Sequence, residues 1–80
     1  MNITLIQGSY APAEALELVG KIIAEKIKFQ ENKISKSCNE EDIKMREGRI
    51  KSLQNEFTAI KSTIRGKSGT VSLNAIIEIN

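Results

Sequence analysis

Three basic residues, Lys61, Arg65 and Lys67, lie close together in the sequence, and cations gathered in this way can bind phosphate groups. Only Glu56 is an acidic neighbour of this group. A helix C-terminus also favours cations, because its last carbonyl groups carry partial negative charge. Few aromatic residues are available to stack on bases. We therefore expect the three cations to stabilise a helix end, and we keep nucleic-acid binding through them as the alternative function.

The residues that follow, Gly66 to Thr70, read Gly-Lys-Ser-Gly-Thr and are similar to the end of a phosphate-binding P-loop. A P-loop has another glycine five positions before this one and leads from a strand into a helix. Here that position is Lys61, and the expected order is helix and then strand. We interpret Gly66 as the residue that follows a helix C-terminus, and the remainder as a turn.

Acid–base and metal chemistry find few candidates in this chain. It has no histidine, and its ten acidic residues include a single aspartate, Asp42. Four acidic residues precede a Lys or Arg by four positions, which is the better orientation for a surface ion pair on a helix. These are Glu17, Glu40, Asp42 and Glu47. We expect no catalysis, no metal and no cofactor.

Cys38 is the only cysteine, so it cannot form a disulfide within the chain, and this favours a reducing compartment. We interpret it as an exposed turn residue. No apolar run approaches the 18 residues that indicate a membrane span. A net charge of +2 is too small to imply an acidic partner by itself. The sequence therefore predicts a cytoplasmic protein without a membrane partner.

The elements that must position these residues begin with two helices, about 12–36 and 39–65. Apolar residues recur along the first at spacings of three, four and seven, and along the second in a heptad pattern from Ile43 to Ile64. Pro12 suits the first turn of a helix. Ser37 and Glu40 form a capping-box pattern ahead of the second helix.

A turn near Cys38 separates the two helices. Ile43 follows Ile34 by nine residues, which at about 100° per residue places it on the opposite face of a continuous helix. The sequence thus predicts an antiparallel helical hairpin. Five apolar pairs whose residue numbers add up to 76 or 77 fit one register, namely Ile34 with Ile43, Ile27 with Ile50, Ile23 with Leu53, Val19 with Phe57, and Leu16 with Ile60.

The same register places Gln30 opposite Arg46, where each apolar stripe lacks its expected residue. Isolated polar layers of this kind commonly fix the pairing of helices, and we predict that role here. Two alternatives stay open for Arg46, which could extend to solvent or pair with Asp42. Gly48, nearby, is expected to let the helices approach closely.

Alternating apolar residues predict a strand at each end of the chain. Met1 to Gln7 alternates until Gly8 and Ser9 interrupt it, and the same period returns from Val71. A helical hairpin brings both strands to its base in opposite directions. We therefore expect one domain of residues 1–80 with an α+β fold of βααβ order, in which the short terminal strands pair antiparallel.

A two-stranded sheet is marginally stable alone, and several apolar residues have no partner in this arrangement. They are Ile6, Ala15, Leu18, Ile22 and Ile76. Self-association would cover them. The function we expect is that of a small structural or protein-interaction module that forms a homo-oligomer, most simply a homodimer, through its heptad helices and terminal strands. A further protein partner is expected, but the sequence does not identify it.

Overall fold

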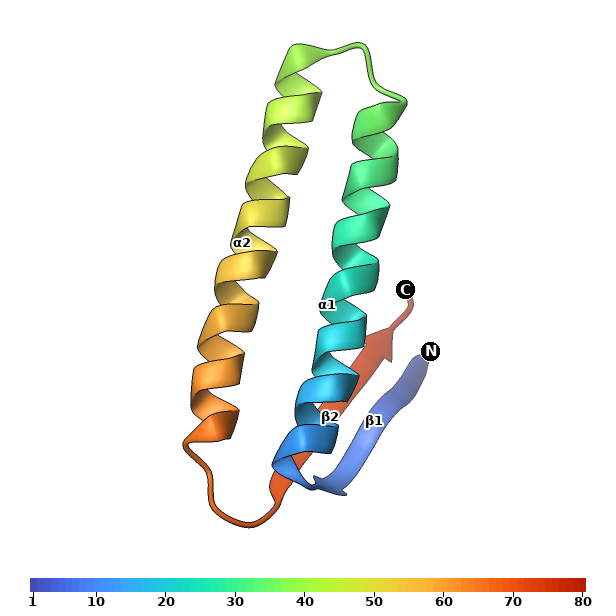
Figure 1. Ribbon diagram of the computed structural model, residues 1–80. Helices are drawn as coiled ribbons and strands as arrows, with labels where there is room; N and C mark the ends of the chain where they lie inside the picture. Colours follow the sequence, from blue (N-terminus) through green and yellow to red (C-terminus); the bar gives the residue numbers. More distant parts are fainter.

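The structure, a computed structural model, describes all residues from 1 to 80. Its elements follow the order β1 (Asn2–Tyr10), α1 (Pro12–Ser35), α2 (Glu40–Arg65) and β2 (Val71–Glu78). The two helices form an antiparallel hairpin, and the two paired strands run from its base back along the side of α1 (Figure 1). The predicted α+β fold of βααβ order is confirmed.

Helix α1 begins where the sequence indicated. Ala11 is extended, with φ of −63° and ψ of 149°, and Pro12 opens the first turn. The Ala11 N–H donates to the Glu14 Oε1 at 3.2 Å. This bond uses a backbone donor outside the helix, so Glu14 fixes the angle at which β1 enters α1.

Helix α2 is capped by Asn39, and the predicted capping box of Ser37 and Glu40 is wrong. Asn39 Oδ1 accepts hydrogen bonds from the N–H groups of Glu41 at 2.9 Å and Asp42 at 3.2 Å. Asparagine is as good an N-cap as serine, and here it stands one residue before the helix. The Ser37 hydroxyl accepts instead from the Asn39 N–H at 3.2 Å and so shapes the turn before the cap.

The register predicted for the helical hairpin agrees with two contacts between its helices. Arg46 bonds to Gln30, and their numbers add up to 76. Phe57 lies against Gly20, and their numbers add up to 77. Ile23 and Leu53, the central pair of the predicted apolar layers, are the buried residues of this seam.

Close approach of the helices depends on Gly20, and the expectation that Gly48 serves this purpose is wrong. A Cβ atom built on Gly20 would lie 3.2 Å from Cζ of Phe57. A Cβ atom on Gly48 would have no neighbour within 4 Å. Gly48 lies outside the seam because it is two positions away from Arg46, which corresponds to about 200° around the helix.

Strand β1 is longer than the predicted Met1–Gln7, because Gly8 does not interrupt it. Gly8 has φ of +147°, a backbone conformation that residues with side chains rarely adopt, and the strand continues to Tyr10. The Tyr10 ring lies 3.8 Å from the position of a Cβ atom on Gly8. Glycine at position 8 therefore allows the strand to continue where the Tyr10 ring lies against the backbone.

A β-bulge at Leu5 resets the alternation of β1. Thr4 pairs with Ile76 and Ile6 pairs with Ala75, so Leu5 is an extra residue opposite a continuous β2. Before the bulge the odd-numbered residues of β1 lie on the inner face of the sheet, and after it the even-numbered residues do. Ile6 and Tyr10 thereby join the same face as Met1 and Ile3.

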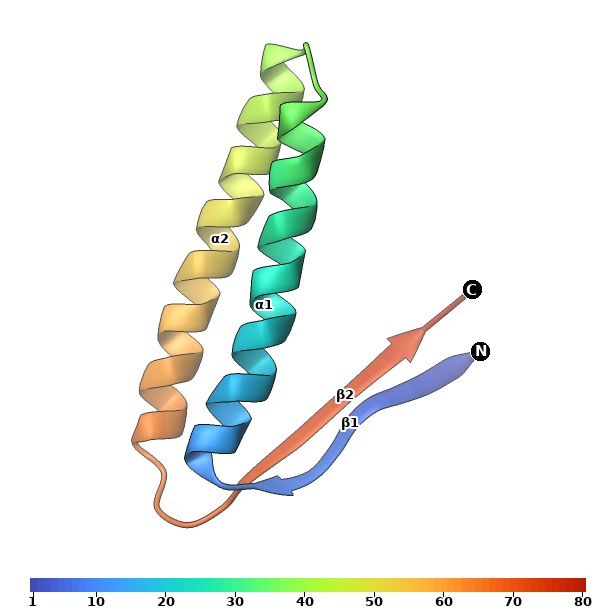
Figure 2. The same cartoon turned by 45° about the vertical axis from the view of Figure 1, so that its right-hand side comes forward.

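The core lies at the base of the molecule, where the inner face of the sheet meets the hairpin. Ala15 of α1, Ile64 of α2 and Val71 of β2 are buried together. Tyr10, Leu16, Ile60 and Leu73 pack around them partly buried. Away from this point the sheet diverges from the helices (Figure 2), and only five residues of the chain are buried.

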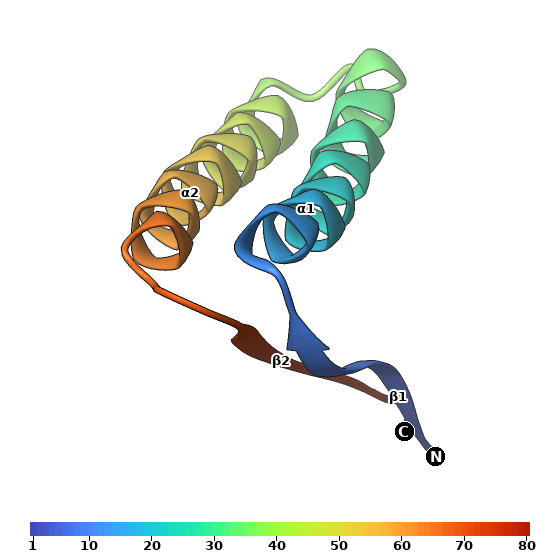
Figure 3. The same cartoon turned by 60° about the horizontal axis from the view of Figure 1, so that its bottom comes forward.

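The turn from α2 to β2 depends on Gly69. Gly66 directly follows the last residue of α2, as predicted, and has φ of −78°, which any residue adopts. Gly69 has φ of +84°, in the region that favours glycine. In the view from the base (Figure 3), this turn carries the chain from α2 into β2 on the side of the sheet nearer α2.

Neither helix has the length and apolar character that crossing a lipid bilayer requires.

Candidate interaction surface

The end of the sheet that points away from the helices is apolar and exposed. Its exposed apolar residues come from both strands and are Met1, Ile3, Leu5, Ile76, Ile77 and Ile79. Ile3 pairs directly with Ile77 across the sheet. We call this group the distal apolar patch. Single exposed apolar residues are ordinary, but a contiguous group on one element marks an interaction surface.

Most of the distal apolar patch continues the face that forms the core. Val71 and Leu73 pack against α1 and α2, and Ile77 of β2 and Ile79 just beyond it follow at alternate positions on the same face. The face becomes uncovered only because the helices diverge from it (Figure 2). Ile76 points to the opposite face and is 58% exposed.

Strand β2 has one edge without a partner. Met1 and Ile79 exchange two backbone hydrogen bonds, of 2.9 Å and 2.7 Å, so the N–H and C=O groups of Ile79 point toward β1. In an antiparallel pair these directions alternate along each strand. The even-numbered residues of β2 therefore direct their backbone donors and acceptors away from β1, and these residues are Ser72, Asn74, Ile76 and Glu78.

The two free edges of the sheet differ in regularity. The edge of β1 contains the bulge at Leu5 and the glycine at position 8, both of which hinder the addition of another strand. Strand β2 has no bulge, glycine, proline or lysine, and its only charged residue is Glu78. The β2 edge is thus the one that is suited to strand pairing.

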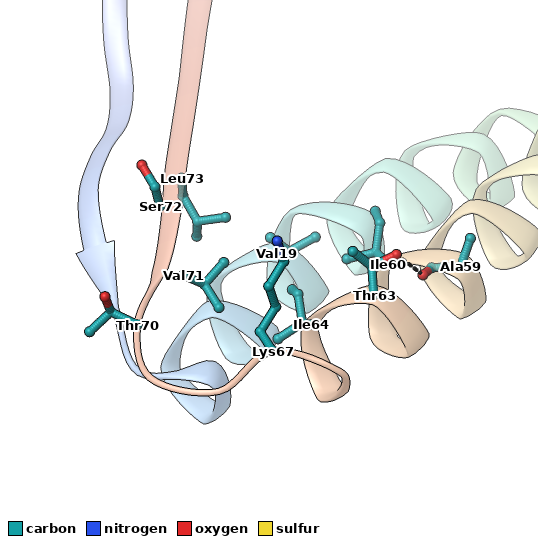
Figure 4. Close-up of a pocket in the computed structure, with 10 residues that line it drawn as sticks. All are labelled: Val19, Ala59, Ile60, Thr63, Ile64, Lys67, Thr70, Val71, Ser72 and Leu73. Atoms are coloured by element: carbon teal, nitrogen blue, oxygen red, sulfur yellow. Dashed lines mark hydrogen bonds between the residues drawn. The ribbon is translucent and has the colours of Figure 1, made fainter.

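An open apolar groove of about 650 Å³ lies beside the first half of β2 (Figure 4). No residue of β1 lines it. Its apolar lining residues are Val19, Ala59, Ile60, Ile64, Val71 and Leu73. The Thr63 hydroxyl, which also lines it, already donates to the Ala59 carbonyl at 3.0 Å. The groove therefore offers mainly apolar surface, between the base of α2 and the free edge of β2.

The three predicted cations take different positions around the base. Lys61 and Arg65 lie one turn apart on α2, and the Lys61 ammonium lies 4.9 Å from the centroid of the Phe57 ring. Lys67 extends from the turn along the groove, whose lining excludes Lys61 and Arg65 (Figure 4). None of the three has an acidic partner within 4.0 Å. All three belong to the end of α2 or to the turn that follows it.

The predicted polar layer of Gln30 and Arg46 is present in the helical hairpin. The Arg46 Nη1 donates to Gln30 Oε1 at 2.9 Å, and its Nε donates to Asp42 Oδ2 at 3.1 Å. Both the pairing across the seam and the ion pair with Asp42 therefore occur. The Arg46 and Ser37 side chains hold the pKa of Asp42 below its ordinary value of 3.8 by hydrogen bonding to its carboxylate.

The upper part of the hairpin carries two further exposed apolar side chains, Phe29 of α1 and Met45 of α2. Lys33 lies 5.5 Å from the centroid of the Phe29 ring.

Cys38 is exposed in the turn, as predicted. No acidic or cysteine side chains converge in threes to hold a metal ion.

Comparisons with protein-family models, with curated proteins and with solved structures found no match to this chain. The function is therefore inferred from the geometry of the surface itself.

The groove and the unequal edges of the sheet were not expected from the sequence. The regular alternation of β2 was visible in it, and this is the signal that distinguishes β2 from β1. The position of α2 beside β2, which forms the groove, follows only from the packing of Ile64 against Ala15 and Val71.

Proposed function

We propose that this protein is a small protein-interaction module that associates with itself through its sheet and presents its helical hairpin to another protein. The observation that carries this proposal is the distal apolar patch on an open two-stranded sheet. Both features are unfavourable for an isolated chain, and one association would cover them together.

The small core supports self-association. Only Ala15, Ile23, Leu53, Ile64 and Val71 are buried, in a chain of 80 residues. Small domains bury a low fraction of their surface and often gain stability from oligomerisation. A second copy would supply apolar contacts that the single chain lacks.

The hairpin supplies the surface for a different partner. It extends away from the sheet (Figure 1). In its outer half, Phe29 is 56% exposed and Met45 is 44% exposed. Aromatic and methionine side chains are enriched in protein interfaces. We propose that the partner binds to this half. The packing of α1 against α2 along the heptad seam would hold the two exposed side chains in place. The single cysteine favours the cytoplasm as the compartment.

The mass of the protein in solution tests self-association. We expect light scattering to give twice the chain mass of 8.9 kDa at concentrations of about 10 to 100 μM. Ile77→Glu should lower the mass to that of one chain, because it places a charge in the distal apolar patch. Met45→Glu, at an exposed position far from the sheet, should leave the dimer intact. A wild-type mass of one chain throughout this range would contradict the proposal.

Nucleic-acid binding is the second candidate, favoured by the absence of acidic partners at Lys61, Arg65 and Lys67. Binding through phosphate contacts would weaken steeply between about 50 and 200 mM salt. Replacing all three cations with Gln should then remove binding to duplex DNA and leave helical circular dichroism unchanged. Absence of binding by the wild type at the lower salt concentration would reject this candidate.

A further inference from the structure

We infer that the second copy adds its β2 antiparallel to the free edge of β2, so that two chains share a four-stranded sheet of order β1-β2-β2-β1. This inference rests on the proposed self-association and names the surface that performs it. It commits to one occupant for the edge and for the groove beside it, namely the β2 strand of an identical chain.

The backbone of β2 has free hydrogen-bonding groups for this pairing. Its even-numbered residues direct their N–H and C=O groups to the free edge, and a twofold axis at Asn74 would align those groups with the groups of even-numbered residues in the second copy. A long, regular and apolar edge strand is a template for another strand. The bulged β1 edge lacks this regularity, so the axis lies on the β2 side.

Antiparallel pairing about that axis also explains the groove. The strand direction reverses, so the outer end of one β2 comes to lie beside the inner end of the other. Ile77 of the second copy would then lie opposite Val71 on the inner face, where the groove opens, and Ile79 would follow it at the same end. The exposed apolar residues of one chain thus fit the uncovered apolar groove of the other, and the twofold axis repeats the contact.

Charge is complementary in the same arrangement. Glu78 is the only charged side chain of either strand. Antiparallel pairing would place Glu78 of the second copy at the end of the sheet that holds Thr70, and Lys67 and Arg65 at the base have no acidic partner in the single chain.

The symmetry also explains why such an assembly would stop at two chains. A twofold axis uses the β2 edge of both copies, and the edges that remain are the two bulged β1 strands. These are poor templates for further strands. The inference is therefore a closed dimer rather than a growing filament.

A pair of cysteine variants tests which edge is used. Asn74 of β2 and Gln7 of β1 pair with each other across the sheet, so they lie at the same height on the same face, and both are exposed. In a Cys38→Ser background, Asn74→Cys should crosslink two chains under copper phenanthroline or a short bis-methanethiosulfonate reagent. Gln7→Cys is the matched control. Its two copies would be separated by about three strand spacings, roughly 14 Å, beyond the Cα separation of about 7 Å that a disulfide tolerates.

We expect more than tenfold faster crosslinking of Asn74→Cys than of Gln7→Cys, with wild-type mass and helical circular dichroism in both variants before oxidation. Faster crosslinking of Gln7→Cys would place the axis on β1 and overturn the inference. A dimer in which neither variant crosslinks, or both do so equally, would also overturn it and leave self-association standing. A monomeric mass for the wild type would overturn both proposals.

Discussion

Arg46 connects the two helices, and two successive turns of α2, through a single guanidinium group. It donates to Gln30 across the seam and to Asp42 one turn earlier on its own helix. Its side chain is 19% exposed, whereas the Lys21 side chain in the other ion pair is 74% exposed. Water screens the Arg46 pair less, so we expect it to contribute more to stability than the pair at Lys21.

Asp42→Asn tests this contribution through its dependence on pH. The folded protein lowers the pKa of Asp42, so the carboxylate stabilises the fold above its ordinary value of 3.8 and loses that effect as pH falls through the lowered value. The variant should therefore be less stable than the wild type at neutral pH, and the difference should shrink below pH 3.8. Urea unfolding followed by circular dichroism at a series of pH values measures this. Glu17→Gln, in the exposed pair, should cause a smaller loss at neutral pH, and a difference for Asp42→Asn that stays constant down to acid pH would contradict the assignment.

At the scale of elements, Gly20 fixes how closely α1 and α2 pack. The Phe57 ring occupies the space that a side chain at position 20 would need. Gly20→Leu should lower the free energy of unfolding by about 1 to 3 kcal/mol, because it overfills the seam. Gly48→Leu makes the same chemical change on an open face and should raise stability by up to about 1 kcal/mol through helix propensity. Chemical denaturation of the two variants measures both effects, and an equal loss of stability in the two would show that Gly20 has no special role in packing.

The sequence predicted the elements better than it predicted their ends. Heptad spacing is a long-range pattern repeated over many residues, so the hairpin and its register, with Gln30 opposite Arg46, followed from it. A cap or a turn depends on one residue and its dihedral angles. Asn39 was therefore missed in favour of Ser37, a chemically similar residue from which composition cannot distinguish it. The end of α2 before Gly66 was predicted, but the left-handed conformation of Gly69 in the turn that follows was not.

The bulge and the groove were missed for a different reason. Leu5 looks like a regular member of an alternating strand, and only the pairing partner Ala75 shows that it is an extra residue. Of the candidate site residues, Gln30 and Arg46 were placed correctly because the helical register determines them. The relation of Lys67 to the groove depends on the path of the turn, which local patterns do not encode.

At the scale of the whole molecule, Tyr10 and Val71 pair in the sheet although 61 positions separate them in the sequence. Joining them in an unfolded chain would require the closure of a long flexible loop. The hairpin closes over a short turn and grows through local contacts, and when complete it holds the ends of both strands side by side. The helices are therefore the template for the sheet, and the hairpin should dominate the transition state for folding.

This order of events can be read from kinetics with two buried residues of similar exposure, Leu53 in the seam and Val71 in the sheet. Leu53→Ala should mainly slow the concentration-independent phase of refolding, whereas Val71→Ala should mainly accelerate unfolding. Tyr10, the only tyrosine in a chain without tryptophan, provides the fluorescence signal at the base. The opposite ranking would mean that the strands meet first. If the expected ranking holds, damage to the seam slows the production of native protein, while damage to the sheet shortens its lifetime.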